Sequence, residues 1–313
     1  MEWPRVKPAD PSREKTPGVY ADLDDLIRLQ YKAQGYNFLP RQPVGSLLSG
    51  RHASRVRGRG LNFEEIRAYR PGDDIRTIDW RVTARTGAAH TKLFREERER
   101  PVLVVVDQRN GMFFGSRHCF KSVLAAQLAS LVAWSALDSG DRVGGLVFNA
   151  REHRDIRPRR SRKTVLALLS QLVEYNRALP ETLQDKPVDF GDMLANLRRI
   201  ARPGSSVFLI SDFHGSDQGD AREQLFQLAQ HTEITAIACA DPLEGELPRA
   251  GRYTVTDGTE RSELHTADRV LRRNYHERAA RRRETLSTDL LRLGIPLLAA
   301  STDRPPFTLL QQF

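Results

Sequence analysis

VLVVVD, residues 102–107, is the stretch that decides the fold. Four valines and a leucine stand without a polar interruption, and the run ends in the carboxylate of Asp107. Such β-branched runs are typical of strands that are buried on both faces, as in a parallel sheet. Turn residues follow, and the apolar spacing over Phe120–Leu137 then predicts a long helix. A strand, a loop bearing an aspartate and an apolar helix form the opening of a parallel βα unit.

The same alternation continues to the end of the chain. We expect further strands at Val143–Phe148, Ser206–Ile210, Ile234–Cys239 and Pro296–Ala300, a weaker strand at Tyr253–Thr256, and helices near Thr164–Glu174, Gly191–Ala201, Ala221–Gln230 and Leu264–Leu293. Only a few residues separate Val143–Phe148 from the segment HRDIRP, so a helical crossover cannot fit between them. The predicted fold is therefore α/β, a mostly parallel sheet with one antiparallel edge strand and helices on both faces.

Polar residues follow two of these strands and form a candidate binding rim. Open parallel sheets bind ligands beyond the carboxyl ends of their strands. The rim consists of Asp107, Arg109, Asn110, Asp212 and His214. Arg109 could neutralise one of the aspartates through a charge-assisted bond. His214 could act as a general base, although a lone loop histidine is more often solvated. We favour an interaction surface without a metal.

A second stretch, RAYRPGDDIRTIDWRVTARTG, spans Arg67–Gly87 and mixes carboxylates with arginines. Long arginine stems pack on aromatic rings while their guanidinium groups pair with aspartate. We predict a structural clamp that consists of Arg67, Tyr69, Asp73, Asp74, Arg76, Asp79, Trp80 and Arg85, with the rings covering the carboxylates. Adjacent carboxylates could alternatively bind a metal or do acid/base work. The surrounding arginines favour the structural role, and we expect the clamp to dock on the sheet.

This stretch resembles the signature of the family called domain of unknown function 58. The family core Tyr-x-Pro-Gly-Asp-Asp-x-Arg-x-Ile-Asp-Trp-x-x-x-Ala-Arg is matched over Tyr69–Arg85, and the resemblance continues through VLVVVDQRNGMFFG, GDRVGGLVF and VFLISDF. It implies a von Willebrand factor A-like domain and a link to AAA+ ATPases of the MoxR type. That domain type carries an Asp-x-Ser-x-Ser loop that binds Mg²⁺, but Arg109 and Gly111 stand at the two serine positions here. The resemblance implies Asp107, Asn110 and Asp212 as the remaining oxygen ligands of such an ion, whereas Arg109 could take the place of the metal.

The order of these segments predicts three parts. Residues 1–18 are rich in proline and basic residues and should form a flexible tail. Residues 19–98 should form an N-terminal family-signature segment, which begins with an amphipathic helix over Asp22–Gln34, continues into a basic loop and ends with the clamp. Residues 99–313 should form the von Willebrand factor A-like domain.

Composition narrows the function classes further. The chain has 313 residues and a net charge of +9, which would suit a polyanion or an acidic protein partner. No run reaches the roughly 18 apolar residues that a membrane span requires, and the N-terminus lacks the apolar region of a signal peptide. Cys119 and Cys239 lie far apart within apolar runs, which indicates buried free thiols and a reducing cytoplasm.

Motifs for common catalytic chemistry are missing from the sequence. It contains no phosphate-binding GxxxxGK[ST], no HExxH zinc motif and no GxSxG nucleophile elbow. We therefore predict a non-enzymatic protein-interaction module, an adaptor or co-chaperone-like partner of a MoxR-type AAA+ ATPase in protein maturation or stress response. Two alternatives are a nucleic-acid-binding protein, for which the basic runs Arg157–Lys163 and Arg269–Arg283 speak, and a metal-dependent hydrolase.

Overall fold

The computed structural model describes residues 18–35, 61–70, 73, 75–96, 100–182, 188–256 and 261–310. Contacts between residues divide the chain into two compact units. The sheet unit consists of Met1–Pro40 and Arg100–Phe313, and the hairpin unit consists of Arg41–Glu99. Each unit is considered by itself below.

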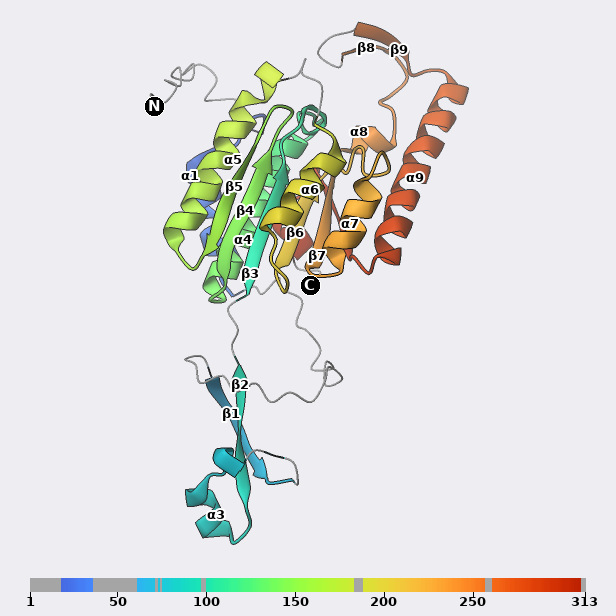
Figure 1. Cartoon of the computed structure of the whole chain (residues 1–313). Coiled ribbons are helices and arrows are strands. Elements are labelled where there is room, and N and C mark those ends of the chain that lie inside the picture. Colours follow the sequence, from blue (N-terminus) through green and yellow to red (C-terminus); the bar gives the residue numbers. More distant parts are fainter. Residues whose placement is uncertain are drawn as a thin grey trace. The chain divides into compact units, whose positions relative to one another are not determined.

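A sheet of six strands forms the centre of the sheet unit (Figure 1). In spatial order these are β10 (Leu297–Ser301), β7 (Glu233–Ala240), β6 (Ser206–Ser211), β3 (Pro101–Asp107), β4 (Arg142–Phe148) and β5 (His153–Arg159). All neighbours are parallel except β4 and β5, which form the predicted antiparallel edge hairpin. The predicted α/β class with a mostly parallel sheet is thus confirmed, and β3 occupies a central position because its run is buried on both faces.

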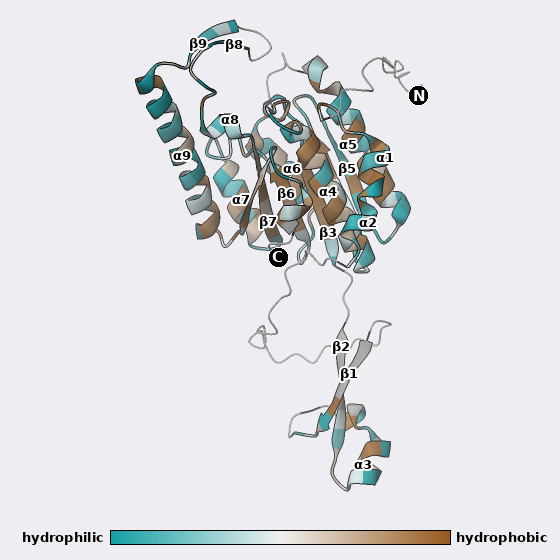
Figure 2. Ribbon diagram, turned by 180° about the vertical axis from the view of Figure 1, so that it is seen from behind, coloured by the Kyte–Doolittle hydropathy of each residue, from teal (hydrophilic) through white to brown (hydrophobic). Residues whose placement is uncertain are grey.

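Two hydrophobic cores lie on the two faces of this sheet. Val102, Val104 and Val106 belong to one core, and Leu103 and Val105 belong to the other, as the alternation of side chains along a strand requires. The first core also contains residues of α1 (Leu23–Arg28), α2 (Gln30–Ala33), α4 (Lys121–Asp138) and α5 (Arg162–Thr182); the second contains residues of α6 (Phe190–Ile200), α7 (Ala221–Ala229) and α9 (Arg269–Arg292). Figure 2 shows β6, β7 and α4 largely in the colours of apolar residues and α9 as mostly hydrophilic.

The first helices of the described chain pack in the sheet unit. Leu26 is 1% exposed, and its carbonyl oxygen accepts hydrogen bonds from Ser130 Oγ (2.6 Å) and Trp134 Nε1 (3.3 Å) of α4. The amide of Ala21 donates to Asn176 Oδ1 of α5 at 2.7 Å. The helix predicted over Asp22–Gln34 is therefore present as α1 and α2, but it belongs with the sheet rather than with the N-terminal segment in which we had placed it. The cause is its apolar stripe, which covers the outer side of α4.

The C-terminal half differs from expectation at several places: α5 extends to Thr182, beyond the predicted Glu174, and the start of the last long helix also differs. We predicted a single helix over Leu264–Leu293, but α9 begins at Arg269 because the side chain of Asp268 caps it by accepting from two backbone amides. The residues before the cap form β9 (Arg261–His265), which pairs antiparallel with β8 (Arg252–Thr256). Between β7 and β8 lies the short helix α8 (Pro242–Gly245), and α10 (Phe307–Leu310) follows β10.

The hairpin unit contains the signature stretch. It is built from β1 (Leu61–Ala68) and β2 (His90–Glu96), which pair antiparallel, and from η2 (Ile75–Thr77) and α3 (Trp80–Thr86) between them. The alternation over His90–Phe94 is typical of a short strand, and these residues lie in β2, whereas the sequence pattern did not indicate β1. Gly87 ends α3 at a φ of 74°, a conformation that costs glycine little. None of the helices in the described part of the chain is long and apolar enough to cross a membrane.

Candidate functional site

The carboxylate of Asp107, at the end of β3, is enclosed by an arginine two residues further on. Arg109 donates from Nη2 to Asp107 Oδ2 at 2.8 Å and from Nε to both oxygens at 3.1 Å, and its backbone amide donates to Oδ1 at 2.8 Å. Ser211, at the end of β6, donates from Oγ to Oδ2 at 2.7 Å. Asp107 is 0% exposed. This is the charge-assisted bond that the sequence predicted as an alternative to a metal.

Arg109 also ties together loops from three parts of the chain. Its Nη2 donates to the carbonyl of His214 at 3.1 Å, and its Nη1 donates to the carbonyl of Val188 at 3.4 Å. The guanidinium lies over the rings of Phe190 and Phe148, at 5.2 and 5.6 Å from their centroids. Burial acts to lower the pKa of Arg109, but the carboxylates of Asp107, Asp212 and Asp189 together outweigh burial and raise that pKa above its usual value. The arginine is therefore a permanent cation inside the rim.

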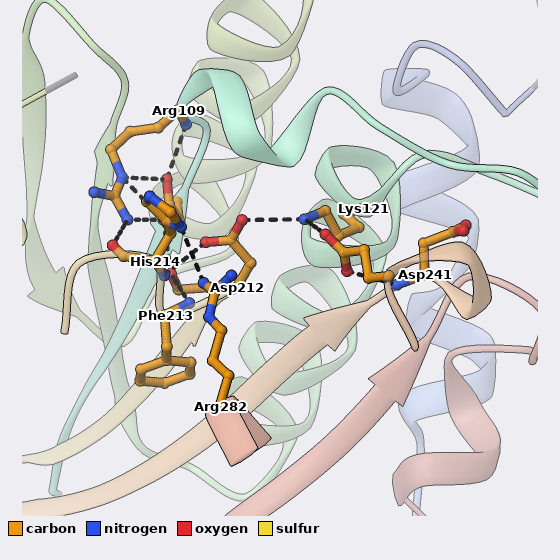
Figure 3. Close-up of polar contacts among 10 residues, drawn as sticks. Arg109, Lys121, Asp212, Phe213, His214, Asp241 and Arg282 are labelled. Carbon is orange, nitrogen blue, oxygen red and sulfur yellow. Dashed lines mark hydrogen bonds and ion pairs between the residues drawn. The ribbon is translucent and has the colours of Figure 1, made fainter. Parts of the chain in front are cut away.

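Asp212, the second rim carboxylate, pairs with a buried lysine (Figure 3). Lys121, in the first turn of α4, places Nζ 3.0 Å from Asp212 Oδ2 and 2.5 Å from Glu244 Oε1 of α8, and its side chain is 1% exposed. Burial opposes ionisation of both partners, but the Coulomb attraction between them prevails: the pKa of Lys121 is raised and the pKa of Asp212 is lowered. Both groups therefore remain charged at neutral pH.

A third buried carboxylate, Asp241, follows β7. It accepts hydrogen bonds from the backbone amide and the Oγ of Ser116, both at 2.7 Å, and from Oγ1 of Thr302. Asp241 also accepts from the amide of Leu243 and so caps α8. In return, the side chain of Glu244 accepts from the amide of Asp241. Burial acts to raise the pKa of Asp241, but these donors hold it below its usual value. The loop after β3 is thereby joined to the ends of β7 and β10.

His214 and Asn110 complete the predicted rim. The amide of His214 donates to Asp212 Oδ1 at 2.9 Å, and its ring Nδ1 lies 3.1 Å from Nη2 of Arg282 on α9 (Figure 3). Phe213, between Asp212 and His214 in the sequence, has a φ of 56°, which non-glycine residues seldom adopt. This residue turns the chain at the end of β6. Asn110 begins the short helix η3 (Asn110–Met112) beside them. Asp107, Arg109, Asp212 and His214 are thus brought together by direct contacts.

The donor set at the rim does not fit the magnesium ion predicted for Asp107, Asn110 and Asp212. Both oxygens of Asp107 accept from Arg109, and those of Asp212 accept from Lys121 and from the amide of His214. A divalent cation would have to displace two buried positive side chains that already hold these carboxylates. In addition, a Cβ at Gly111 would lie 2.8 Å from Asp212 Oδ2, so a serine there would require the Asp212 side chain to shift. These contacts favour the metal-free interaction surface over the magnesium alternative.

Comparison with known proteins identifies the family. The model of the family described as "Protein of unknown function DUF58" matches residues 65–285. This chain belongs to the DUF58 family.

Similar proteins are known from mycobacteria. Uncharacterized proteins of Mycobacterium tuberculosis (strain ATCC 25618 / H37Rv) and Mycobacterium bovis are each 29% identical to this DUF58 chain over 286 residues, which is 90% of the chain and 87% of the relative. Among solved structures, the conserved hypothetical protein BatB from Bacteroides thetaiotaomicron has 12% identity and a TM-score of 0.39 over 68% of this chain and 94% of its own. An aerotolerance-related membrane protein from Bacteroides fragilis has 12% identity and a TM-score of 0.41 over 68% of this chain and 100% of its own.

The DUF58 signature contains one arginine–aspartate pair of the predicted clamp among the contacts that the structure describes. Arg67 binds Asp73 through two bonds of 2.8 and 2.9 Å, and the amide of Arg70 donates to the same carboxylate at 2.8 Å. Asp79 also caps α3 by accepting from two backbone amides. Trp80 does not cover the carboxylates, because it is 70% exposed.

The remaining clamp residues differ in how far they are buried. Tyr69 is half-buried and its amide donates to the carbonyl of Ala89, whereas the side chains of Arg76 and Arg85 are exposed. Asp74 lies outside the described residues. The docking of the clamp on the sheet stays a prediction.

Sequence reasoning missed Lys121, Glu244 and Asp241. Lys121 could have been found from one signal: it is a lysine at the start of the very apolar helix α4. A lone charge in such a run must find a partner. Glu244 lies 123 residues further along the chain, so its pairing with Lys121 had no sequence signal.

Proposed function

We propose that this DUF58 chain is a non-enzymatic protein-interaction module of the cytoplasm. The observation that carries the proposal is the internal neutralisation of the rim: Arg109 holds Asp107 and Lys121 holds Asp212. A general base must take up a proton near neutral pH, but the pKa of Asp212 is lowered from its usual value, and the two oxygens of Asp107 are engaged by Arg109. A rim of this kind has fixed shape and fixed charge, which suits recognition better than turnover.

The type of module follows from topology together with the sequence resemblance. The sheet has one antiparallel edge strand, β5, on an otherwise parallel arrangement, and the candidate site lies at the strand ends. These features support assigning the sheet unit to the von Willebrand factor A-like class, as its motifs suggest. In this chain the two buried cations take the place of a metal ion in ordering the loops after β3 and β6.

The partner we propose is an AAA+ ATPase of the MoxR type, for which this chain acts as an adaptor that presents a client protein. The support is the family signature over Tyr69–Arg85, because the resemblance that it carries is to proteins linked with such ATPases. The charge of +9 fits association with an acidic protein surface.

Direct binding tests this function. The MoxR-type ATPase encoded in the same genome is purified, immobilised and titrated with the full chain, with and without ATP. We expect saturable binding at about 150 mM salt with a dissociation constant in the micromolar range or tighter, which corresponds to about −8 kcal/mol. An unrelated AAA+ ATPase serves as the control. The proposal fails if the cognate ATPase binds no more tightly than the control, or if the chain itself turns over phosphoester or peptide substrates in a way that Asp212→Ala abolishes.

A further inference from the structure

The outward side of α3 carries the most exposed large apolar residue in the described part of the hairpin unit. Trp80 is 70% exposed, and Ile75 in the adjoining η2 is 66% exposed. Arg81, Ala84 and Arg85 are exposed as well, whereas Val82 and Thr83 are half-buried. With 3.6 residues per turn, positions 80, 81, 84 and 85 share one side of a helix. We call these four residues, with Ile75, the α3 outer face.

This face is held on a rigid base. The bidentate pair of Arg67 and Asp73 joins β1 to the residue two positions before η2, with bonds of 2.8 and 2.9 Å. Asp79 then caps α3 through bonds of 2.9 and 3.1 Å to the amides of Arg81 and Val82. On the inward side, Thr83 Oγ1 accepts from the amide of His90 in β2 at 3.1 Å. Trp80 is therefore displayed by a preorganised element, which reduces the entropy that binding would cost.

The chemistry of the face specifies what it would bind. Tryptophan and arginine dominate the binding energy of protein interfaces, where they fill pockets near the centre of the contact. Here the exposed residues Arg81 and Arg85 share one side of the helix with Trp80, and the exposed Arg76 follows Ile75 in the sequence. The complementary surface is an apolar pocket rimmed by aspartate and glutamate.

Other occupants fit less well. A second copy of the chain would bring another net charge of +9 against this basic face. Single-stranded nucleic acids are bound by several aromatic side chains along a groove, whereas the α3 outer face offers one aromatic ring beside the aliphatic Ile75 and Ala84. Phosphate contacts to a duplex use basic and polar side chains and leave the exposed Trp80 and Ile75 without a role.

We propose that the α3 outer face is the surface through which this chain binds an acidic protein partner, with Trp80 as the anchor. The inference rests on the proposed function, since the probe is the MoxR-type ATPase introduced above. It adds the location of the contact, which is on the hairpin unit rather than on the rim of the sheet unit.

Binding of the purified ATPase to variants of the full chain tests this location. Trp80→Ala should weaken binding by about 30-fold or more, the effect of removing an interface anchor. Arg81→Glu combined with Arg85→Glu should weaken it by at least about tenfold and slow association, with the larger loss at low salt. Leu291→Ala and Arg278→Glu, which alter exposed residues of α9, are the matched controls and should change affinity less than about threefold.

The outcomes separate the two proposals. If the wild type binds and the α3 variants bind equally well, the location is wrong and the proposed function stands. If the wild type does not bind, both fall. Protection of the Arg70 amide from hydrogen exchange, which depends on its bond to Asp73, shows whether the hairpin unit of each variant is still folded.

Acrylamide quenching of Trp80 gives an independent readout. In a Trp3→Phe background the remaining tryptophans are Trp80 and Trp134, which is 5% exposed and should be quenched little. Trp80 should be quenched in the isolated chain and become shielded when the ATPase is added. Shielding already present in the isolated chain at low concentration would mean that the rest of the chain covers the face. Shielding that grows with chain concentration would indicate a second copy, and shielding by a DNA duplex would indicate nucleic acid; each of these three results overturns the inference.

Discussion

Lys121 Nζ lies 3.0 Å from Asp212 Oδ2 although only 1% of the lysine side chain is exposed. The pair joins the first turn of α4 to the end of β6, and Glu244 extends it to α8 after β7. A deeply buried ion pair contributes little net free energy to folding, but removing one of its partners is costly. The remaining charge would then be left unpaired in a medium of low dielectric constant.

Removing the lysine should therefore be costly. We expect Lys121→Met to lower the free energy of unfolding by about 3–5 kcal/mol, since it leaves the Asp212 carboxylate buried without its cation. Urea unfolding followed by circular dichroism measures the loss. Lys163→Met, at an exposed position on α5, should change stability by less than about 0.5 kcal/mol. Adding Asp212→Asn to Lys121→Met should restore part of the stability. A loss below about 1 kcal/mol for Lys121→Met would show that the lysine is not buried as described.

The same pair predicts how stability depends on pH. The pKa of Asp212 is lowered in the folded chain, so the unfolded chain, with an ordinary aspartate pKa near 3.9, takes up protons first on acidification. Asp241, whose pKa is also lowered, acts in the same direction. Asp212 and Asp241 should therefore contribute a constant stability above about pH 4. The urea midpoint of the wild type should fall as the pH drops further through the folded pKa values of these two groups.

Lys121→Met should reverse the contribution of Asp212. Without the cation, burial becomes dominant and raises the pKa of Asp212 above its unfolded value, so protonation then favours the folded state. The deficit of the variant relative to the wild type should shrink as the pH falls from 7 towards about 4. Urea midpoints of both proteins at pH 7, 6, 5 and 4 test this expectation. Parallel curves would contradict the assignment of the shift to Lys121.

Magnesium should leave the chain unaffected. Arg109 and Lys121 occupy the rim carboxylates, so we expect no saturable heat from titration with Mg²⁺ or Mn²⁺ up to about 10 mM, well above the dissociation constants of weak oxygen-ligand sites. A protein with an intact Asp-x-Ser-x-Ser metal loop serves as the positive control. Saturable heat from the wild type that disappears in Asp212→Asn would restore the metal site that the structure argues against.

The residue pattern alone predicted the strands of the sheet, but it did not predict most of the side-chain contacts at the rim. Unbroken apolar runs such as Val102–Val106 predict buried strands, and the short gap after Phe148 predicts the antiparallel edge, because both follow from local sequence. The pairing of Arg109 with Asp107 could also be predicted from local sequence, because the two residues are two positions apart. The bond from Lys121 to Glu244 spans 123 residues and depends on how β6, β7 and α4 pack, which no local pattern specifies. Trp80 was expected to cover the clamp, but it is the first residue of α3 after the N-cap Asp79 and is 70% exposed.

The position of the first helices leads to a final prediction. Leu26 is 1% exposed and lies in the core formed with α4 and α5, so Leu26→Ala should lower the free energy of unfolding by about 2–5 kcal/mol. Trp134, whose indole donates to the carbonyl of Leu26, reports on this core. In a background with Trp3→Phe and Trp80→Phe, the fluorescence transition of Trp134 should move to lower urea for Leu26→Ala. Tyr31→Ala, which alters a side chain that is 69% exposed on α2, should leave the transition within about 0.5 kcal/mol of the parent. If α1 and α2 instead folded with the N-terminal signature segment, Leu26→Ala would leave the Trp134 transition unchanged, because that transition reports only on the core beneath α4.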